Sequence, residues 1–238
     1  MDLRLFSTRD KVLLGVVGLI VLVFIGYMIY RGKTSAITEP VTITDEQRAK
    51  VESQIAEIQG RLKSCDEASD DNKCSQFYLQ LGLNYESLGQ ISWALDAYEG
   101  AAEADDKNYV PYSNIGSIYR RLKDFAKAEE VFKKALSIHP NNPNIYTKLF
   151  ELYYYDQRKA PHEVQPLFLQ AVRDTNGDLN MVRLYAFYSE TINDPAVAAD
   201  LWKLILEQDK NLSQADKDKI NKKIADLTKS AKEQGLIE

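Results

Sequence analysis

Glycine, proline, histidine and cysteine are scarce in this chain of 238 residues, which has eleven Gly, seven Pro, two His and two Cys. So few glycines and prolines argue against an all-β fold, which needs a turn after each short strand. Two cysteines and the distant His139 and His162 cannot supply the four ligands of a structural zinc site. We therefore expect no metal site and no cofactor.

Catalytic motifs are also missing. The sequence has no glycine-rich phosphate loop, no HExxH and no nucleophile elbow between a strand and a helix, so we expect a protein that is not an enzyme. Basic residues are in the minority: the net charge is −5, and residues 1–33 alone carry +3, which leaves −8 for the rest. An acidic soluble part lacks the basic surface of a nucleic-acid-binding protein, so no nucleic-acid partner is expected.

A long run without charge is present near the amino terminus. After segment 1–11, residues 12–30 (VLLGVVGLIVLVFIGYMIY) span roughly 28 Å as a helix, about one hydrocarbon core. This run predicts a transmembrane helix in contact with the lipid bilayer. A cleaved signal peptide is the alternative, with Thr34-Ser35-Ala36 as the cleavage site, but the run exceeds the usual hydrophobic stretch of a signal. The sequence favours an uncleaved signal-anchor.

The charges that flank this run favour one orientation. Arg4, Arg9 and Lys11 precede it, whereas Arg31 and Lys33 follow it. Cytoplasmic flanks are richer in Lys and Arg, so we expect a single-pass protein with its amino terminus inside and its soluble part outside the cytoplasm. The opposite topology remains open.

A linker at 31–44 and an amphipathic helix at 45–64 are expected next. Thr44 and Gln47 have the spacing of a capping box. Val51, Ile55, Ile58 and Leu62 then form one apolar stripe. Either the following helices or a second copy of the chain, in a short coiled coil, could cover this stripe, so the oligomeric state is left open.

Cys65 and Cys74 bracket an acidic connection, DEASDDNK, and two interpretations compete. They are unrelated thiols in a surface turn, or they form a disulfide across a helical hairpin. A bridge over so short a loop stabilises by about 2–3 kcal/mol. It would form in an exported compartment and would agree with the orientation above.

The most regular stretch is 109–142. Two amphipathic helices are separated by a turn at Lys123-Asp124, and Pro140 ends the second. Small residues at Gly116, Ala128 and Ala135 alternate with large ones such as Tyr112, Tyr119 and Phe132. Length, spacing and terminal proline resemble the tetratricopeptide repeat (TPR) family, whose unit is a helix–turn–helix of about 34 residues.

The resemblance extends over residues 75–212. It divides them into units 75–108, 109–142, 143–176 and 179–212. The third has Phe150 at the small position and about two extra residues at 158–161. A helix within 213–238, with Ile220, Ile224 and Leu227 on one face, has the composition of a cap. We therefore expect an all-α fold: an α-solenoid of about four units with a carboxyl-terminal capping helix, preceded by one transmembrane helix.

In TPR proteins the first helix of each unit lines an inner, concave wall that binds protein or peptide partners. The resemblance implies that this wall includes Leu79, Leu83, Val110, Asn114, Arg120, Arg121, Tyr154, Tyr155, Arg183 and Phe187. Asn114 alone matches the Lys, Arg and Asn set that grips acidic chaperone tails, and Leu79 and Leu83 replace two of that set. An apolar and aromatic wall is predicted instead, unless neighbouring helices cover it.

The resemblance implies a membrane-anchored scaffold or adaptor for protein–protein interaction. Its architecture is similar to bacterial anchored TPR proteins that aid the assembly or secretion of other proteins. Two alternatives remain: a structural subunit of an envelope or secretion complex, and a cytosol-facing receptor similar to mitochondrial import receptors.

Overall fold

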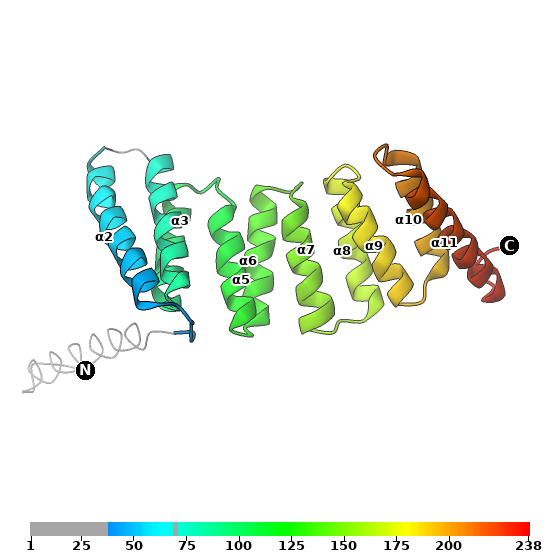
Figure 1. Cartoon of the computed structure of the whole chain (residues 1–238), viewed down its shortest axis with the longest axis horizontal. Helices are drawn as coiled ribbons and strands as arrows, with labels where there is room; N and C mark the ends of the chain where they lie inside the picture. The colour runs from blue at the N-terminus through cyan, green and yellow to red at the C-terminus, as the bar shows by residue number, and fades with distance from the viewer. Residues whose placement is uncertain (1–37, 69–70) are drawn as a thin grey trace, which may run out of the picture. The chain divides into compact units, whose positions relative to one another are not determined.

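The computed structural model describes residues 38–68 and 71–238. Segment 1–11, the predicted membrane run 12–30 and the linker up to residue 37 lie outside the described residues. No helix in the described ranges is long and apolar enough to cross a bilayer. The chain divides into two compact units between Ala104 and Asp105 (Figure 1).

Within the described ranges the regular elements are all helices. The first unit contains α2 (Asp45–Ala68), α3 (Asp71–Ser87) and α4 (Ile91–Ala104). The second contains α5 (Val110–Arg121), α6 (Phe125–Ile138), α7 (Pro143–Glu151), the π-helix η2 (Leu152–Asp156), α8 (Pro161–Asp174), α9 (Leu179–Thr191), α10 (Pro195–Gln208) and α11 (Gln214–Glu233). Within each unit, consecutive helices pack against each other, which confirms the prediction of an all-α, TPR-like helical repeat.

One contact recurs in the helix pairs: an aromatic ring of the second helix lies against one position of the first. The four pairs are Gly82/Tyr98, Gly116/Phe132, Phe150/Phe168 and Ala186/Trp202. A Cβ atom added to Gly116 would lie 2.6 Å from the Phe132 ring, so the ring occupies the space that a side chain would need. In the third pair two rings meet instead, with centroids 4.8 Å apart.

The turn between the two helices of each pair has a residue with positive φ. These residues are Gly89, Lys123, Arg158 and Asn193. Gly89 and Lys123 are 34 residues apart, but Lys123 and Arg158 are 35 apart. The prediction that the extra length of the third unit lies at 158–161 is therefore wrong in part. One extra residue is inserted before the turn, where the Gln157 N–H donates to the Leu152 carbonyl (2.9 Å) and closes the wide turn of η2.

The described part of the predicted linker is bound to the first unit. Thr38 pairs with Gln90 in an isolated bridge, and the Glu39 N–H donates to the Gly89 carbonyl (2.9 Å). A Cβ atom at position 89 would lie 2.1 Å from the Glu39 carbonyl oxygen, which explains why this turn has glycine where the others have Lys, Arg or Asn. The chain from residue 38 is therefore fixed to the turn between α3 and α4.

The apolar stripe of α2 packs within the first unit. Thr44 and Gln47 form the predicted reciprocal cap, at 3.0 and 3.1 Å. Ile55, Ile58 and Leu62 are buried in a cluster with residues of α3 and α4. The helix runs to Ala68 rather than to residue 64.

The interpretation of the cysteines as unrelated thiols in a surface turn is wrong, and the interpretation as a disulfide across a helical hairpin is confirmed. Cys65 lies within α2 and Cys74 within α3, both are buried, and they form a disulfide with their Cα atoms 5.7 Å apart. Both helices run past the expected loop ends, so the bridge crosslinks two packed helices and lies inside them rather than at the ends of the connection.

The last helix covers α9 and α10. Ser213 caps α11 by accepting from the Asp216 N–H (3.2 Å). Ile220, Ile224 and Leu227 pack against the cluster that contains Trp202. The predicted apolar face of this helix is therefore partly buried against the preceding pair.

We expect Gly116→Ala to lower the free energy of unfolding by about 1–2 kcal/mol. The new methyl would overlap the buried Phe132 ring, a cost of about 1–3 kcal/mol that outweighs the helix-propensity gain of up to about 1 kcal/mol. Denaturant unfolding followed by circular dichroism measures the change. Gly60→Ala, in α2 with open space around the new methyl, is the matched control and should be neutral or stabilising. A stabilised Gly116→Ala variant would contradict the packing argument.

Candidate protein-binding surface

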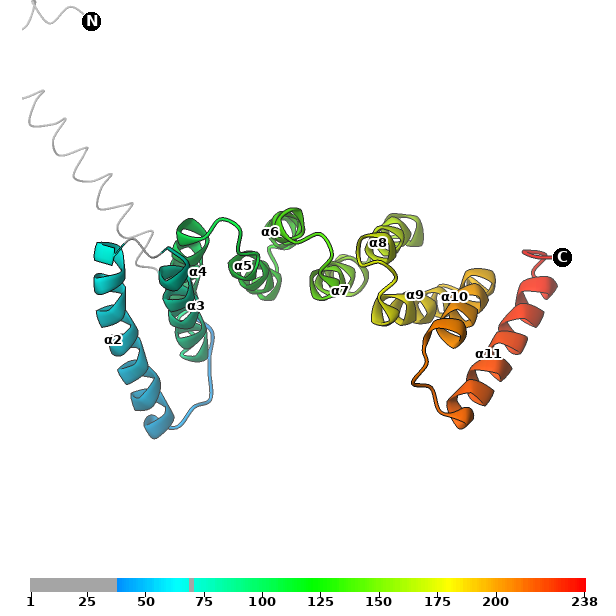
Figure 2. The same ribbon diagram turned by 90° about the horizontal axis from the view of Figure 1, so that it is seen from above.

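Eight of the ten predicted wall residues lie in the second unit. Here α5 and α7 lie on one side and α6 and α8 on the other (Figure 2). We name the surface carried by α5, α7, η2 and α9 the first-helix wall. Its predicted members are Val110, Asn114, Arg120, Arg121, Tyr154, Tyr155, Arg183 and Phe187. The helices α7 and α9 contact each other directly, so this part of the wall is continuous.

Acidic neighbours neutralise two of its arginines. Arg120 forms ion pairs with Glu151 and Asp156, at the end of α7 and in η2. Burial lowers the pKa of Arg120, but hydrogen bonds from it to these carboxylates outweigh burial and raise the pKa. Arg183 is paired in the same way with Asp209. These side chains connect neighbouring helices and do not offer an uncompensated positive site for an acidic peptide.

The aromatic members differ in exposure. Tyr155 is 62% exposed, and its ring meets those of Tyr154 (4.9 Å) and Phe150 (6.0 Å) edge-on. Tyr154 is half-buried: it stacks on Phe150 at 5.4 Å and meets Tyr188 of α9 at 5.4 Å. Tyr155 is therefore an outward ring on an ordered aromatic base, whereas Tyr154 is part of that base.

Tyr188 lies beneath this base with a buried hydroxyl that has no hydrogen-bond partner among the described residues. Burial, together with the neighbouring Tyr154 and Tyr185, raises its pKa to about 12. The hydroxyl therefore stays protonated at neutral pH. Tyr188 could not be predicted as a wall residue from the sequence. It comes directly after the exposed Phe187 but lies on the inward face of α9.

Phe187 is the second exposed aromatic of the wall, at 51%. Its ring meets Trp202 edge-on at 5.1 Å, and the Lys223 ammonium lies 5.1 Å from the ring centroid. Glu190 accepts from Lys223 (3.0 Å) and from the Trp202 indole N–H (2.6 Å). This carboxylate fixes the side chains that flank Phe187.

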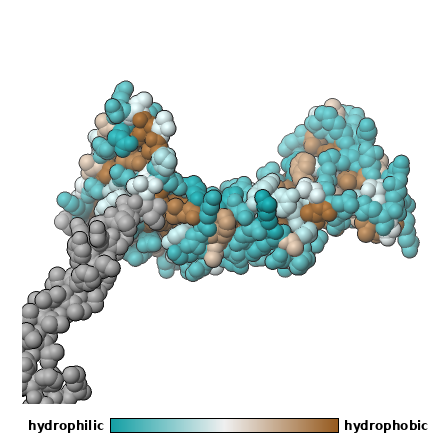
Figure 3. Space-filling view, turned by 90° about the horizontal axis from the view of Figure 1, so that it is seen from below, coloured by the Kyte–Doolittle hydropathy of each residue, from teal (hydrophilic) through white to brown (hydrophobic). Residues whose placement is uncertain are grey.

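The two remaining predicted residues, Leu79 and Leu83, belong to α3 of the first unit. Leu79 is half-buried. Leu83 is exposed at the rim of a groove of about 310 Å³ between α2 and α3, which Ile58 and Arg61 also line. Figure 3 shows hydrophobic side chains gathered on the first unit, whereas the second is mostly hydrophilic in the same view.

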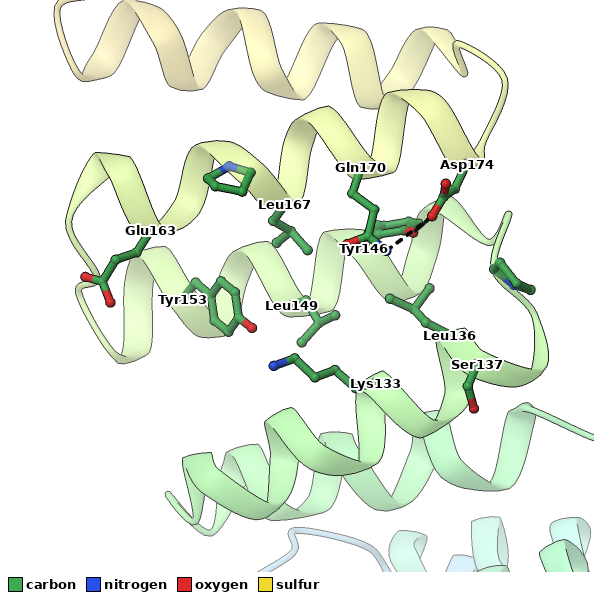
Figure 4. Close-up of a pocket in the computed structure, with 12 residues that line it drawn as sticks. Lys133, Leu136, Ser137, Tyr146, Leu149, Tyr153, Glu163, Leu167, Gln170 and Asp174 are labelled. Carbon is green, nitrogen blue, oxygen red and sulfur yellow. Dashed lines mark hydrogen bonds between the residues drawn. The ribbon is translucent and has the colours of Figure 1, made fainter.

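A larger groove, of about 570 Å³, lies among α6, α7, η2 and α8 (Figure 4). Tyr146, Leu149 and Tyr153 face it with the helical spacing of a single face. Three of its polar groups pair with each other: the Tyr146 hydroxyl donates to Asp174 (2.5 Å), and Gln170 donates to the same carboxylate (3.3 Å). This groove could not be predicted from the sequence, because the same residues serve as ordinary packing positions of the repeat.

Glu129 of α6 holds the irregular segment that follows α7. It accepts from Tyr153 of η2 (2.9 Å) and from Lys133 (2.7 Å) and Lys159 (3.1 Å). Burial alone would raise the pKa of Glu129, but these hydrogen bonds outweigh it and lower the pKa to about 2. The carboxylate therefore positions the same π-helical segment that carries Tyr154 and Tyr155.

Residues 109–142 match the family model described as "Tetratricopeptide repeat". The chain carries a tetratricopeptide repeat. The match covers α5, α6 and the turns around them, the pair in which Phe132 lies on Gly116. Among the described residues, no group of three or more His, Cys, Asp or Glu side chains is arranged to hold a metal ion.

Two curated relatives share part of the chain. "Uncharacterized protein ycf37" of Pyropia yezoensis is 35% identical over 68 residues, which are 29% of this chain and 38% of the relative. "Tetratricopeptide repeat protein 6" of Homo sapiens is 28% identical over 97 residues, 41% of this chain and 19% of the relative. The chain thus spans well under half the length of either relative.

Solved structures also resemble the chain. One, reported under "Functional Characterization of Pseudomonas Aeruginosa pilF", has 21% identity and a TM-score of 0.47, with 68% of this chain and 71% of that chain covered. Another is "Crystal structure of PilW, widely conserved type IV pilus biogenesis factor", with 23% identity, a TM-score of 0.45 and coverage of 69% and 87%.

We expect Glu129→Gln to lower the free energy of unfolding at neutral pH by about 1–2 kcal/mol, a value reduced for solvent screening. The pKa of Glu129 lies below its ordinary value of 4.5, so its contribution is present above pH 4.5 and is lost as pH falls toward about 2. The difference between the wild-type and variant chains should therefore be constant near neutral pH and vanish in acid.

Urea unfolding at a series of pH values measures this difference. Glu130→Gln, at the exposed neighbouring position, is the control and should change stability by less than about 0.5 kcal/mol. A wild-type-to-Glu129→Gln difference that persists unchanged at pH 2 would contradict the assignment.

Proposed function

We propose that this chain is a membrane-anchored TPR scaffold whose first-helix wall binds a segment of another protein. The observation that carries the proposal is Tyr155, an exposed ring that stands on an ordered aromatic base beside a matched repeat. Tyrosine is favoured at recognition surfaces because it adds contact area and a hydroxyl at little entropic cost.

The charges on the wall favour an apolar or aromatic partner segment over an acidic tail. An acidic carboxyl terminus needs cationic groups that are not already neutralised, but Arg120 and Arg183 each have carboxylate partners. Tyr155 and Phe187 instead offer apolar area. We propose that the partner inserts hydrophobic side chains against these two rings.

The anchor and the orientation belong to the same proposal. Residues 12–30 would span the bilayer with the amino terminus inside, and the repeats would lie outside the cytoplasm, where they aid assembly or secretion of the partner. The pairing of Cys65 with Cys74 supports an oxidising compartment.

The alternative function is that of a permanent structural subunit. In that case the chain would stay in a large complex after detergent extraction.

The wall is tested with a photo-crosslinking amino acid at position 155 of the full-length chain in its native membranes. We expect a discrete crosslinked partner from position 155 and none from position 169, because Leu169 is similarly exposed but lies on α8. Identical products from both positions would contradict binding at the wall.

Tyr155→Ala should then weaken the affinity for that partner roughly 5- to 30-fold, equivalent to about 1–2 kcal/mol, with little change in unfolding. Tyr154→Ala is a poor test, because its ring contacts Phe150 and Tyr188 and its loss would disturb packing. Leu169→Ala serves as the matched control and should leave the affinity unchanged.

The orientation is tested by counting thiols. The chain, freshly isolated from its membranes, unfolded and alkylated without reductant, should show no reactive cysteine, because both cysteines are paired. Two reactive thiols per chain would contradict the disulfide and favour a cytosol-facing receptor.

A further inference from the structure

Trp93 is a large hydrophobic side chain that lies exposed on the surface of the first unit. It lies on α4, two residues after the first residue of that helix, and is 54% exposed. Its ring lies 6.1 Å from that of Tyr85, measured between centroids. At the corresponding place in the next repeat, 34 residues on, stands the exposed Lys127, so packing between the helices does not require an aromatic residue here.

The chain that leads toward the predicted membrane run is fixed at the same end of the first unit (Figure 1). Thr38 pairs with Gln90, and the Glu39 N–H bonds to Gly89. Ile43 then packs into the cluster formed by α2 and α3. Trp93 follows Gln90 by three residues, so it lies within about 5 Å, measured along the helix axis, of the point where this chain is held.

The distance available between that point and the bilayer is short. The apolar run ends at Tyr30, eight residues before Thr38. Even fully extended, eight residues span at most about 29 Å. Part of this length crosses the polar interface of the bilayer, which is roughly 5–8 Å thick on each side. With residues 12–30 in the bilayer, the turn between α3 and α4 therefore lies less than about 29 Å from the lipid headgroups.

We propose that this end of the first unit rests on the bilayer, with Trp93 inserted at the level of the headgroups. Tryptophan prefers this zone because its ring is apolar and its N–H can still bond to water or headgroup oxygens. Asp45 and Glu46 are exposed at the start of α2, so the partner surface is a zwitterionic one rather than a strongly anionic one. This inference depends on the membrane anchor of the proposed function.

The test uses the full-length chain in phosphatidylcholine nanodiscs, with and without brominated acyl chains that quench nearby tryptophan. The protein has two tryptophans, and Trp202 is buried in the other unit, where it serves as the reference. Bromination should lower the emission of Trp93 and leave that of Trp202 unchanged, so the total should fall by the share that Trp93 contributes. In Trp93→Phe, bromination should have almost no effect.

Two further measurements sharpen the outcome. A flexible Gly/Ser insertion of about 20 residues after Lys33 should reduce the quenching of Trp93, because the longer linker lowers its effective concentration at the bilayer. Discs with a large fraction of phosphatidylglycerol should give less quenching than pure phosphatidylcholine. Equal or stronger quenching in the anionic discs would overturn the choice of a zwitterionic surface.

The anchor and the Trp93 contact fail in different ways. A chain that does not copurify with the discs would overturn the anchor, and this inference with it. A chain that stays in the discs without quenching, or with equal quenching in Trp93→Phe, would overturn the Trp93 contact and leave the anchor standing. Quenching unaffected by the insertion would overturn the role of the short linker.

Discussion

An aromatic ring that lies on a residue with little or no side chain is the contact on which the helix pairs depend. Phe132 on Gly116 and Tyr98 on Gly82 bring the two helices of a pair close enough for the remaining apolar residues to meet. Where Phe150 replaces the small residue, α7 ends at Glu151 and a π-helix follows. The irregular segment that exposes Tyr155 therefore occurs in the one repeat that lacks the small residue.

Much of the fold could be predicted from the sequence because its signals are local. The capping box at Thr44, the turn at Lys123-Asp124 and the apolar face of α11 depend on residues three or four positions apart, and all are present. Two features depend on contacts remote in the sequence and were missed. The chain near Thr38 binds a turn some fifty residues later, and the π-helix is held by Glu129 of the preceding pair.

The wall could be predicted by position but not by chemistry. The register of the repeat places Arg120, Arg183 and Tyr155 on first helices. The structure has Arg120 on α5 and Arg183 on α9, whereas Tyr155 lies on the π-helix η2 that follows α7. It could not reveal that Glu151, Asp156 and Asp209 neutralise the arginines, because those acids come from other helices or turns. It also treated Tyr154 and Tyr155 alike, whereas contact with Tyr188 of α9 half-buries Tyr154 and leaves Tyr155 exposed.

Within each unit, helices pack chiefly against the helix before and the helix after them. Chains with such local contacts fold quickly, and each pair can close once its second helix has been made. Cys65 and Cys74 are nine residues apart and are the only cysteines, so a single intramolecular pairing exists and no reshuffling is needed. The first unit therefore contains, on its own side of the division at Ala104, every residue that its crosslink requires.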